Sequence, residues 1–340
     1  MILITGAAGF IGYHLTKRLA ESGHEILCID NINNYYDVDL KYSRLAALGL
    51  KKCPDEINAG SLVNSALFPS VRFGKIDICD TQRIAELFSN NCFDIVLHLA
   101  AQAGVRYSLA NPHAYISGNI QGFLNILEAA KQNPPRHLVY ASSSSVYGLN
   151  TKTPFSENDA VNQPASLYAA TKRSNELMAY TYSHLYNIPV TGLRFFTVYG
   201  PWGRPDMSPV IFARSIIEDK PINVFNNGNM KRDFTFIGDI VEGIVHVMKN
   251  IPVKKANEAA PAALYNIGYG KPVPIMDFIN TLEKTLHKKA AINYAPMQKG
   301  DMIETWADCS ALERDTGYCP QTELSHGIQQ FVAWYKDYYK

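Results

Sequence analysis

The chain has 340 residues, a formal net charge of +1, 47% hydrophobic residues and 19% charged residues, which is typical of a globular protein. It lacks the basic excess of nucleic-acid-binding or membrane-surface proteins, and no apolar run approaches the roughly 20 residues that span a membrane. The six cysteines form neither a CxxC pair nor a zinc-like cluster with histidines. This pattern favours reduced thiols in a cytoplasmic protein without a metal site. The opening MILITGAAGF also lacks the basic segment of a signal peptide.

The first 195 residues alternate short apolar runs with helical patterns. The apolar runs predict strands at 2–5, 25–30, 71–77, 94–100, 137–142 and 189–195. Helical periodicity lies between most of them, at 10–22, 81–91, 113–132 and 166–186. Strands separated by helices are typical of a parallel sheet covered on both faces, so we predict a Rossmann-type, doubly wound α/β fold. An insertion at 31–70 interrupts the alternation and is expected to be helical at 40–50.

The pattern changes after residue 196, where Pro and Gly become frequent. Single helices are expected at 210–220, 240–250, 275–286 and 326–339. We therefore predict two domains. A dinucleotide-binding domain comprises residues 1–195, and the chain is expected to return to it near 236–268. A smaller C-terminal α/β domain, which binds the substrate, comprises 196–235 and 269–340.

A glycine loop lies between the first strand and the first helix. TGAAGFIG places Gly6, Gly9 and Gly12 in a GxxGxxG spacing, and glycines let the backbone approach a pyrophosphate at the start of a helix. The second strand ends in Asp30, whose carboxylate can accept hydrogen bonds from both ribose hydroxyls and would repel a 2′-phosphate. Asn31 follows, not arginine. These residues predict NAD rather than NADP, with a solvated strand end as the alternative for Asp30.

The sequence YAATK places Tyr168 and Lys172 one turn apart on the same helix face. A lysine ammonium and a positive nicotinamide can lower the tyrosine pKa from about 10, so that the phenolate can take a proton. Ser143, in ASSSSVYG, lies just past the carboxyl end of a predicted strand, and ligands of parallel sheets bind at these ends. Its hydroxyl can hydrogen-bond the same substrate hydroxyl. A second YxxxK match, Tyr13 with Lys17, lies on the helix after the glycine loop and is expected to pack or face solvent.

Segments along most of the chain resemble the nucleotide-sugar epimerases of the extended short-chain dehydrogenase/reductase family. They are TGAAGFIG, HLAAQAGVR, SSSSVYG, YAATK, LRFFTVYGPWGRPDM and GNMKRDFTFIGDIVEG. The combinations NINNYYD, AAQAGVRYS and GPWGRPDM are most similar to the UDP-glucuronate 4-epimerase group. The resemblance implies an isomerase that uses NAD to oxidise C4 of the sugar and returns the hydride to the other face, interconverting UDP-glucuronate and UDP-galacturonate.

The resemblance also implies the residues that bind NAD. Lys172 would contact the nicotinamide ribose, and Asn119 would contact the cofactor or buttress the site, with a helix-interior polar residue as the alternative. The full set is Gly6, Gly9, Phe10, Ile11, Gly12, Asp30, Asn31, Asp77, Ile78, Leu99, Ala100, Ala101, Asn119, Tyr168 and Lys172.

The substrate residues are carried over from the family in the same way. Arg232 matches the phosphate-binding arginine, and Arg204 is a second candidate, with a surface salt bridge as its alternative. In MQKGD, Gln298 replaces an arginine of UDP-galactose-type relatives, and Asp301 is a candidate for a ribose contact. The full substrate set is Ser143, Ser144, Ser145, Thr197, Arg204, Arg232, Asp301 and Arg106.

A glucuronate substrate must be protected against loss of its carboxylate, because its 4-keto form is a β-keto acid. Ser144 and Ser145 stand where related decarboxylases and dehydratases carry acidic residues. We expect these two serines and Thr197 to hold the carboxylate, with a role in shaping the turn as the alternative for the serines. Arg106 is a further candidate, with a structural ion pair as its alternative.

The sequence is also compatible with other functions. The enzyme alternatives are a 4-epimerase of another UDP-hexose or UDP-N-acetylhexosamine(uronate) and a UDP-glucuronate decarboxylase. A non-catalytic NAD-binding module would be expected to lose Tyr168 or Lys172, and both are present. The helices predicted at 113–131 and 167–187 are apolar on more than one face, and the equivalent family pair forms a dimer interface. We therefore expect a homodimer that binds a UDP-sugar and neither nucleic acid nor membrane.

Overall fold

The computed structural model describes residues 1–50, 61–297 and 302–340. The chain divides into two compact units. The first unit comprises Met1–Asn150, Ala160–Arg194 and Ile244–Tyr265, and the second comprises Thr151–Asp159, Phe195–Gly243 and Asn266–Lys340. Within the described ranges, no helix has the length and apolar character that would let it cross a membrane.

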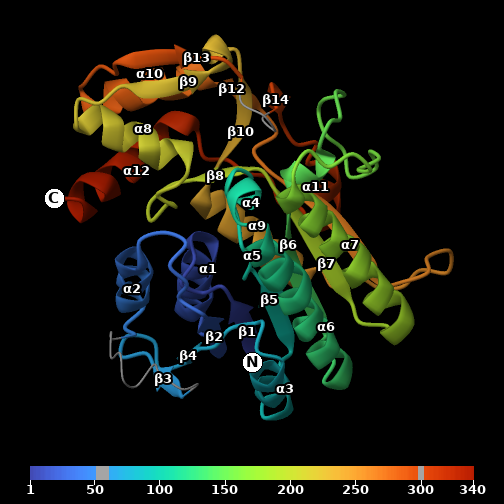
Figure 1. Ribbon diagram of the computed structural model, residues 1–340. Coiled ribbons are helices and arrows are strands. Elements are labelled where there is room, and N and C mark those ends of the chain that lie inside the picture. Colours follow the sequence, from blue (N-terminus) through green and yellow to red (C-terminus); the bar gives the residue numbers. More distant parts are fainter. Residues whose placement is uncertain (51–60, 298–301) are drawn as a thin grey trace. The chain divides into compact units, whose positions relative to one another are not determined.

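An eight-stranded sheet forms the centre of the first unit (Figure 1). Its strands are β1 (Ile2–Thr5), β2 (Ile26–Asp30), β3 (Leu62–Asn64), β4 (Val71–Lys75), β5 (Ile95–His98), β6 (His137–Ser143), β7 (Val190–Phe195) and β11 (Ala262–Ile267). Their spatial order is β11-β7-β6-β5-β1-β2-β4-β3. Strand β1 pairs in parallel with both β2 and β5, so the strand order reverses direction there, which is where doubly wound sheets bind ligands. The predicted parallel α/β fold is confirmed; the short antiparallel β3 was not predicted.

The helices of the first unit connect these strands. They are α1 (Phe10–Glu21), α2 (Val38–Ala47), α3 (Thr81–Ser89), α4 (Tyr107–Ala110), α5 (Pro112–Tyr115), the π-helical turn η2 (Ile116–Gln121), α6 (Gly122–Gln132), the 3₁₀ turn η3 (Ser144–Tyr147) and α7 (Leu167–Tyr186). Helix α9 (Ile237–Lys249) begins in the second unit and ends in the first. The helices predicted at 10–22, 40–50, 81–91 and 166–186 are confirmed as α1, α2, α3 and α7.

The core of the first unit explains why its strands are continuously apolar. Helices α3, α6 and α7 lie side by side (Figure 1), and their apolar side chains pack with Leu3, Val96 and Leu138 of the sheet. The alternating residues Ile2 and Ile4 of β1 are buried as well. Both faces of the sheet are therefore covered, as a parallel sheet requires.

The single helix predicted at 113–132 is instead three joined segments, α5, η2 and α6. A π-helical turn holds one extra residue and shifts the backbone hydrogen bonds from i−4 to i−5. Asn119 lies in this turn, and its carbonyl accepts a hydrogen bond from Asn175 Nδ2 of α7 at 2.6 Å. Hydrophobic periodicity follows the buried face and does not reveal such a local change.

The second unit is built from short strands and single helices. The strands are β8 (Thr197–Tyr199), β9 (Ile222–Phe225), β10 (Lys231–Phe236), β12 (Pro272–Pro274), β13 (Ile292–Ala295) and β14 (Glu304–Thr305). The helices are α8 (Ser208–Ile217), the 3₁₀ turn η4 (Asn226–Gly228), α10 (Ile275–Leu286), α11 (Ser310–Thr316) and α12 (Leu324–Tyr338). Strand β10 pairs with β8, β12 and β14, while β9 pairs with β13. Phe234 of β10 stacks on Phe278 of α10 at 4.3 Å between ring centroids.

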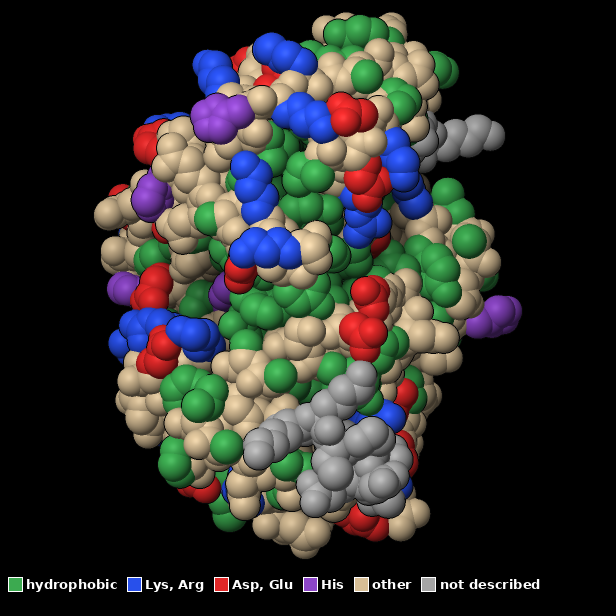
Figure 2. Space-filling view, turned by 90° about the vertical axis from the view of Figure 1, so that its left-hand side faces the viewer, with side chains coloured by type: hydrophobic (Ala, Val, Ile, Leu, Met, Phe, Trp, Pro, Cys, Tyr) green, Lys and Arg blue, Asp and Glu red, His purple; other side chains and the backbone are tan. Residues whose placement is uncertain are grey.

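The surface carries charges of both signs. On the face drawn in Figure 2, acidic and basic side chains are interspersed among apolar and neutral ones. This distribution agrees with the net charge of +1.

Candidate active site

The glycine loop packs directly against the residues that follow β5. Gly6 has φ +75°, and a Cβ placed on it would lie 2.7 Å from the backbone nitrogen of Ala100. A Cβ on Gly12 would lie 2.1 Å from the carbonyl oxygen of Gly6, so only glycine fits at either position. Gly9 is the N-terminal cap residue of α1, and in the described part of the chain no side chain caps this helix end. The positive end of α1 therefore remains available to a diphosphate.

Asp30 ties the end of β2 to the glycine loop. It is 8% exposed, and its oxygens accept hydrogen bonds from the N–H of Ala8 at 3.1 Å and of Ile32 at 2.8 Å. It is therefore buried, which rules out the alternative of a solvated strand end. Each oxygen keeps a second lone pair for a ribose hydroxyl.

Asn31 and Asp77 also lie together, although they follow different strands. Asn31 Nδ2 donates to Asp77 Oδ2 at 2.9 Å, and Asp77 Oδ1 accepts from the N–H of Cys79 at 2.8 Å. Ile78 is buried, and its carbonyl accepts from Asn125 Nδ2 of α6 at 2.9 Å. Two predicted cofactor residues are thus joined at the ends of β2 and β4.

Sequence reasoning missed Arg44, which α2 brings to the glycine loop. Its side chain is fully buried, and its guanidinium donates to the carbonyl of Ala8 at 2.8 Å and to the hydroxyl of Tyr36 at 2.7 Å. The signal was an arginine on the apolar face of the predicted helix, between Leu40 and Leu45. This guanidinium places positive charge beside the proposed diphosphate site.

Helix α7 positions Tyr168 and Lys172. The helix begins after Ser166, whose hydroxyl accepts the N–H of Ala169 at 3.1 Å. Lys172 is 3% exposed, and its ammonium donates to the carbonyl of Ala141 in β6 at 2.9 Å. Burial lowers the pKa of Lys172 to about 8, and the nearby charge of Glu176 opposes that change.

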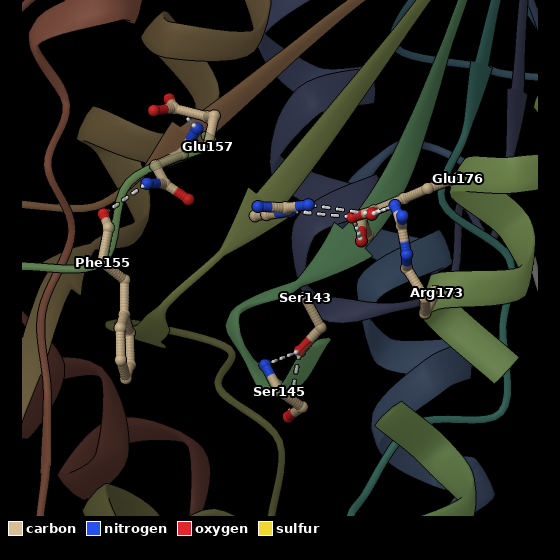
Figure 3. A network of polar contacts seen from close by, with 9 residues as sticks. Ser143, Ser145, Phe155, Glu157, Arg173 and Glu176 are labelled. Carbon is tan, nitrogen blue, oxygen red and sulfur yellow. Dashed lines mark hydrogen bonds and ion pairs between the residues drawn. The ribbon is translucent and has the colours of Figure 1, made fainter. Parts of the chain in front are cut away.

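The serines at the end of β6 have different contacts. Ser142 is buried, and its hydroxyl donates to Glu176 Oε1 at 2.6 Å. Ser143 Oγ accepts the N–H of Ser145 at 3.2 Å and donates to Ser145 Oγ at 3.2 Å, as drawn in Figure 3. Ser144 and Ser145 are half-buried and form the first residues of η3. The run of hydroxyls therefore combines a link to α7 with the cap of a short helical turn.

Asn119 is held entirely by protein groups. Its Oδ1 accepts from the N–H of Gln102 at 2.8 Å, and its Nδ2 donates to the carbonyl of Gln102 and to Thr171 Oγ1, both at 3.0 Å. Thr171 in turn donates to the carbonyl of Tyr168 at 2.9 Å. These contacts connect the segment after β5 to the helical turn of α7 that carries Tyr168.

The residues after β5 lie against the first strand. The N–H of Leu99 donates to the carbonyl of Thr5 at 3.2 Å, and that of Ala100 donates to Thr5 Oγ1 at 3.1 Å; Ala101 is half-buried. The Thr5 hydroxyl also contacts His98 Nδ1 at 2.9 Å. Burial, with a smaller effect of the positive charge of Lys172, lowers the pKa of His98 to about 3, so this imidazole is neutral and cannot act as a base near pH 7.

The predicted substrate residues divide between the units. Arg106 is exposed before α4 in the first unit, and Thr197 is half-buried at the start of β8 in the second. Arg204 forms an ion pair with Asp206, with 2.5 Å between NH2 and Oδ2. A salt bridge was the alternative to a substrate contact for this arginine. Asp301, like Gln298, lies outside the described residues.

Arg232 is held by the backbone of the second unit. Its guanidinium donates to the carbonyls of Lys231 at 2.8 Å and Ile303 at 3.2 Å. The next residue, Asp233, is fully buried, and sequence reasoning did not single it out. Its carboxylate accepts one hydroxyl and three N–H hydrogen bonds at 2.8–3.1 Å, from Thr235, Tyr269, Gly270 and Ala307.

Comparisons with known proteins agree with the motifs. The model of the NAD dependent epimerase/dehydratase family matches residues 2–268. The chain belongs to this family. Protein CapI of Staphylococcus aureus is 47% identical over 100% of this chain and 99% of its own length. UDP-glucuronate 4-epimerase 2 of Arabidopsis thaliana is 45% identical over 100% of this chain and 76% of its own. A crystal structure of UDP-glucuronic acid 4-epimerase from Bacillus cereus in complex with UDP-glucuronic acid and NAD superposes with a TM-score of 0.86 at 33% identity, covering 99% of both chains.

Family membership confirms the resemblance that the sequence motifs indicated, and the family uses NAD. The first unit fits that cofactor, because the glycine loop leaves no room for a Cβ and leads into a helix end without a side-chain cap among the described residues. Tyr168 and Lys172 lie one helical turn apart on α7. The individual contacts of each site residue with cofactor and sugar stay predictions.

Proposed function

We propose that the protein is an NAD-dependent 4-epimerase that interconverts UDP-glucuronate and UDP-galacturonate. The proposal is supported by relatives named UDP-glucuronate 4-epimerase at 43–45% identity over 99–100% of the chain. The observation that carries it is the buried ammonium of Lys172, which donates a hydrogen bond to the carbonyl of Ala141. Lys172 lies one helical turn from Tyr168, and Ala141 lies two residues before Ser143. This arrangement suits a phenol that must lose and regain a proton.

The chain's own residues handle the proton. Tyr168 as phenolate accepts the proton of the C4 hydroxyl while the C4–H bond breaks, and it returns that proton to the 4-keto oxygen when the C–H bond re-forms on the opposite face. Bound NAD supplies the reversible hydride acceptor, so no net oxidation occurs. Lys172 stabilises the phenolate by its positive charge, and the Ser143 hydroxyl orients the reacting oxygen.

Other residues would bind and orient the two ligands. We assign the diphosphate of NAD to the glycine loop and the N-terminus of α1, and its adenosine ribose to Asp30 and Asn31. The remaining proposed cofactor residues are Asp77, Ile78, Leu99, Ala100, Ala101 and Asn119. In the second unit, Arg204 and Arg232 are proposed to bind the UDP phosphates.

Neutral hydroxyl groups near the sugar carboxylate would favour epimerisation over decarboxylation. Ser144, Ser145 and Thr197 can hydrogen-bond the C6 carboxylate without donating a proton to C5, and hydrogen bonds of this kind fix its orientation. Arg106 is a further candidate for this contact. An acid in place of either serine would favour proton transfer instead.

We also propose that the protein works as a homodimer in the cytoplasm. Helix α7 exposes Leu177, Tyr180 and Leu185, and the neighbouring η2 exposes Ile116, which are side chains that a second copy could cover. The five cysteines described are free thiols, as expected in a reducing compartment. Light scattering after gel filtration tests the dimer, because a mass near 37.9 kDa would contradict it.

The test of the function is to incubate the purified protein with UDP-glucuronate and follow the products by NMR. We expect UDP-galacturonate and no net NADH, and we expect Tyr168→Phe to lose the conversion. Mainly UDP-pentose would indicate a decarboxylase. Conversion of UDP-glucose or UDP-N-acetylglucosamine, with UDP-glucuronate unchanged, would indicate a 4-epimerase of another UDP-sugar.

A further inference from the structure

A buried carboxylate lies on the same face of α7 as the proposed catalytic pair. Glu176 follows Lys172 by one helical turn and Tyr168 by two. Its side chain is 4% exposed and that of Arg194 in β7 is 1% exposed. We propose that Glu176 is a positioning residue, which acts through Ser142 to hold the end of β6 against α7 and thereby sets Ser143 relative to Tyr168 and Lys172. This inference rests on the proposed function.

The contacts of Glu176 join three elements. Its Oε1 accepts from Ser142 Oγ of β6 at 2.6 Å and from Arg194 Nε of β7 at 2.9 Å. Its Oε2 accepts from Arg194 NH2 at 3.0 Å and from Arg173 NH1 of α7 at 2.9 Å. Figure 3 shows Glu176 between two guanidinium groups, with Arg173 labelled. Charge-assisted bonds with two parallel contacts to one arginine fix the carboxylate in both position and orientation.

The geometry of β6 connects this carboxylate to Ser143. Two consecutive residues of the strand are tied to α7, because Lys172 holds the carbonyl of Ala141 and Glu176 holds the hydroxyl of Ser142. These two contacts fix the backbone of β6 against α7, and with it the position of the Cα from which the next side chain extends. Ser143 is that next residue.

The charges around Glu176 support the same role. Burial alone would raise the pKa of Glu176, but the hydrogen bonds and charge of Arg194 lower it, so the carboxylate is ionised near pH 7. The Arg194 guanidinium also lies over the ring of Tyr147 in η3, 4.8 Å from its centroid. The cluster therefore reaches both the end of β6 and the turn that follows Ser143.

A purely structural ion pair is the competing explanation, and stability must be separated from catalysis to test it. Glu176→Leu combined with Arg194→Met replaces the pair by apolar side chains of similar size, an exchange that often preserves or increases stability. Ser142→Ala removes only the hydroxyl that links Glu176 to the end of β6. Glu283→Gln is the matched control, because Glu283 is 7% exposed and holds Lys289 and the N–H of Ala290 in the second unit.

We expect the double variant to keep the urea midpoint of the wild type while kcat falls on the order of 100-fold, since small displacements of catalytic groups have effects of this size. For Ser142→Ala we expect kcat to fall about tenfold with KM unchanged, because a displaced Ser143 loses an interaction made only in the transition state, and such a loss lowers kcat alone. Glu283→Gln should leave kcat unchanged. Wild-type kcat in either the double variant or Ser142→Ala would overturn the inference.

The assay uses whichever UDP-sugar the wild type epimerises, so that the two proposals can fail separately. Activity on another UDP-sugar would contradict the proposed substrate and still test Glu176 by the same ratios of kcat. A wild-type protein that binds NAD but epimerises no UDP-sugar would overturn both proposals.

Discussion

The two units each bury a carboxylate beside residues with proposed roles, and they neutralise it in opposite ways. In the first unit, Glu176 accepts hydrogen bonds from two arginines and one serine. In the second unit, Asp233 accepts hydrogen bonds from three backbone N–H groups and one threonine hydroxyl. Side-chain charges hold the first carboxylate, whereas main-chain dipoles hold the second.

The partners decide the direction in which each pKa moves. Burial would raise the pKa of Glu176, but the hydrogen bonds and charge of Arg194 bring it below its ordinary value. Burial also raises the pKa of Asp233, and the hydrogen bonds from three N–H groups offset this only in part, so its pKa stays above the ordinary value. Cationic partners therefore fix an ionised group and the side chains around it, whereas backbone partners fix the path of loops.

The largest effect on stability is expected from Glu176→Ala. The substitution leaves the guanidinium of Arg194 buried without its counter-charge, a change that costs about 3–5 kcal/mol of the free energy of unfolding. Urea denaturation at neutral pH measures this loss. Asp94→Ala is the control, because its ion pair with Arg136 has side chains 42% and 70% exposed and contributes at most about 1 kcal/mol. Equal losses in the two variants would contradict the importance of the buried pair.

Asp233→Asn is expected to have a smaller effect on stability and a distinct effect on substrate binding. An amide nitrogen cannot accept hydrogen bonds, so some N–H groups of the loops lose their acceptor, which costs about 2 kcal/mol. Because Arg232 is the adjacent residue, we expect KM for the UDP-sugar to rise with kcat unchanged, as for a group that supports binding throughout the reaction. An unchanged KM would separate Asp233 from the proposed phosphate contact.

The same two positions should respond to acid with opposite signs. The folded pKa of Glu176 is lowered, so its contribution to stability is present above the unfolded pKa of about 4.3 and is lost as pH falls through the folded pKa. The folded pKa of Asp233 is raised, so its contribution is full below the unfolded pKa of about 3.9 and is lost as pH rises through the folded pKa.

Urea denaturation between neutral and acid pH measures this difference. We expect the stability gap between wild type and Glu176→Gln to shrink as pH falls below about 4.3, and the gap for Asp233→Asn to grow as pH falls toward about 3.9. Gaps that change in the same direction would show that the two carboxylates do not differ in the way their partners suggest.

The comparison also marks the limit of sequence reasoning about the fold. Long segments with a clear hydrophobic periodicity, such as α7, were predicted because the apolar residues mark the buried face of the helix. The strands of the second unit were missed because they are short and irregular, as in β12, which reads Pro272–Pro274. The π-helical turn at Asn119 was missed because its hydrogen-bond shift leaves the apolar pattern intact.

The residues of the site also differ in how far sequence reasoning could predict them. The places of Gly6 in the loop before α1 and of Tyr168 and Lys172 on one helix could be predicted, because they depend on local spacing. Glu176 continues that spacing along α7, yet its partners come from β6 and β7, 34 and 18 residues away in the chain. Asp233 depends on N–H groups from segments up to 74 residues away, and no local pattern contains that information.

The smallest effects on stability are expected from removing one hydroxyl beside each buried carboxylate. Thr235 is 1% exposed and donates to Asp233 Oδ1 at 3.0 Å, while Ser142 is 2% exposed and donates to Glu176 Oε1 at 2.6 Å. Thr235→Val keeps the shape of the side chain and removes one of four donors, so we expect a loss of about 1 kcal/mol in urea denaturation. Ser142→Ala should cost a similar amount.

The two variants should differ in catalysis, even where their stabilities agree. The three N–H groups that remain on Asp233 still fix the loops in Thr235→Val, so kcat is expected to equal that of the wild type. In Ser142→Ala the strand that carries Ser143 loses its side-chain link to α7, so kcat falls. Parallel decreases in kcat would mean that the main-chain cluster also controls the reacting groups, and the contrast between the two carboxylates would then be one of stability alone.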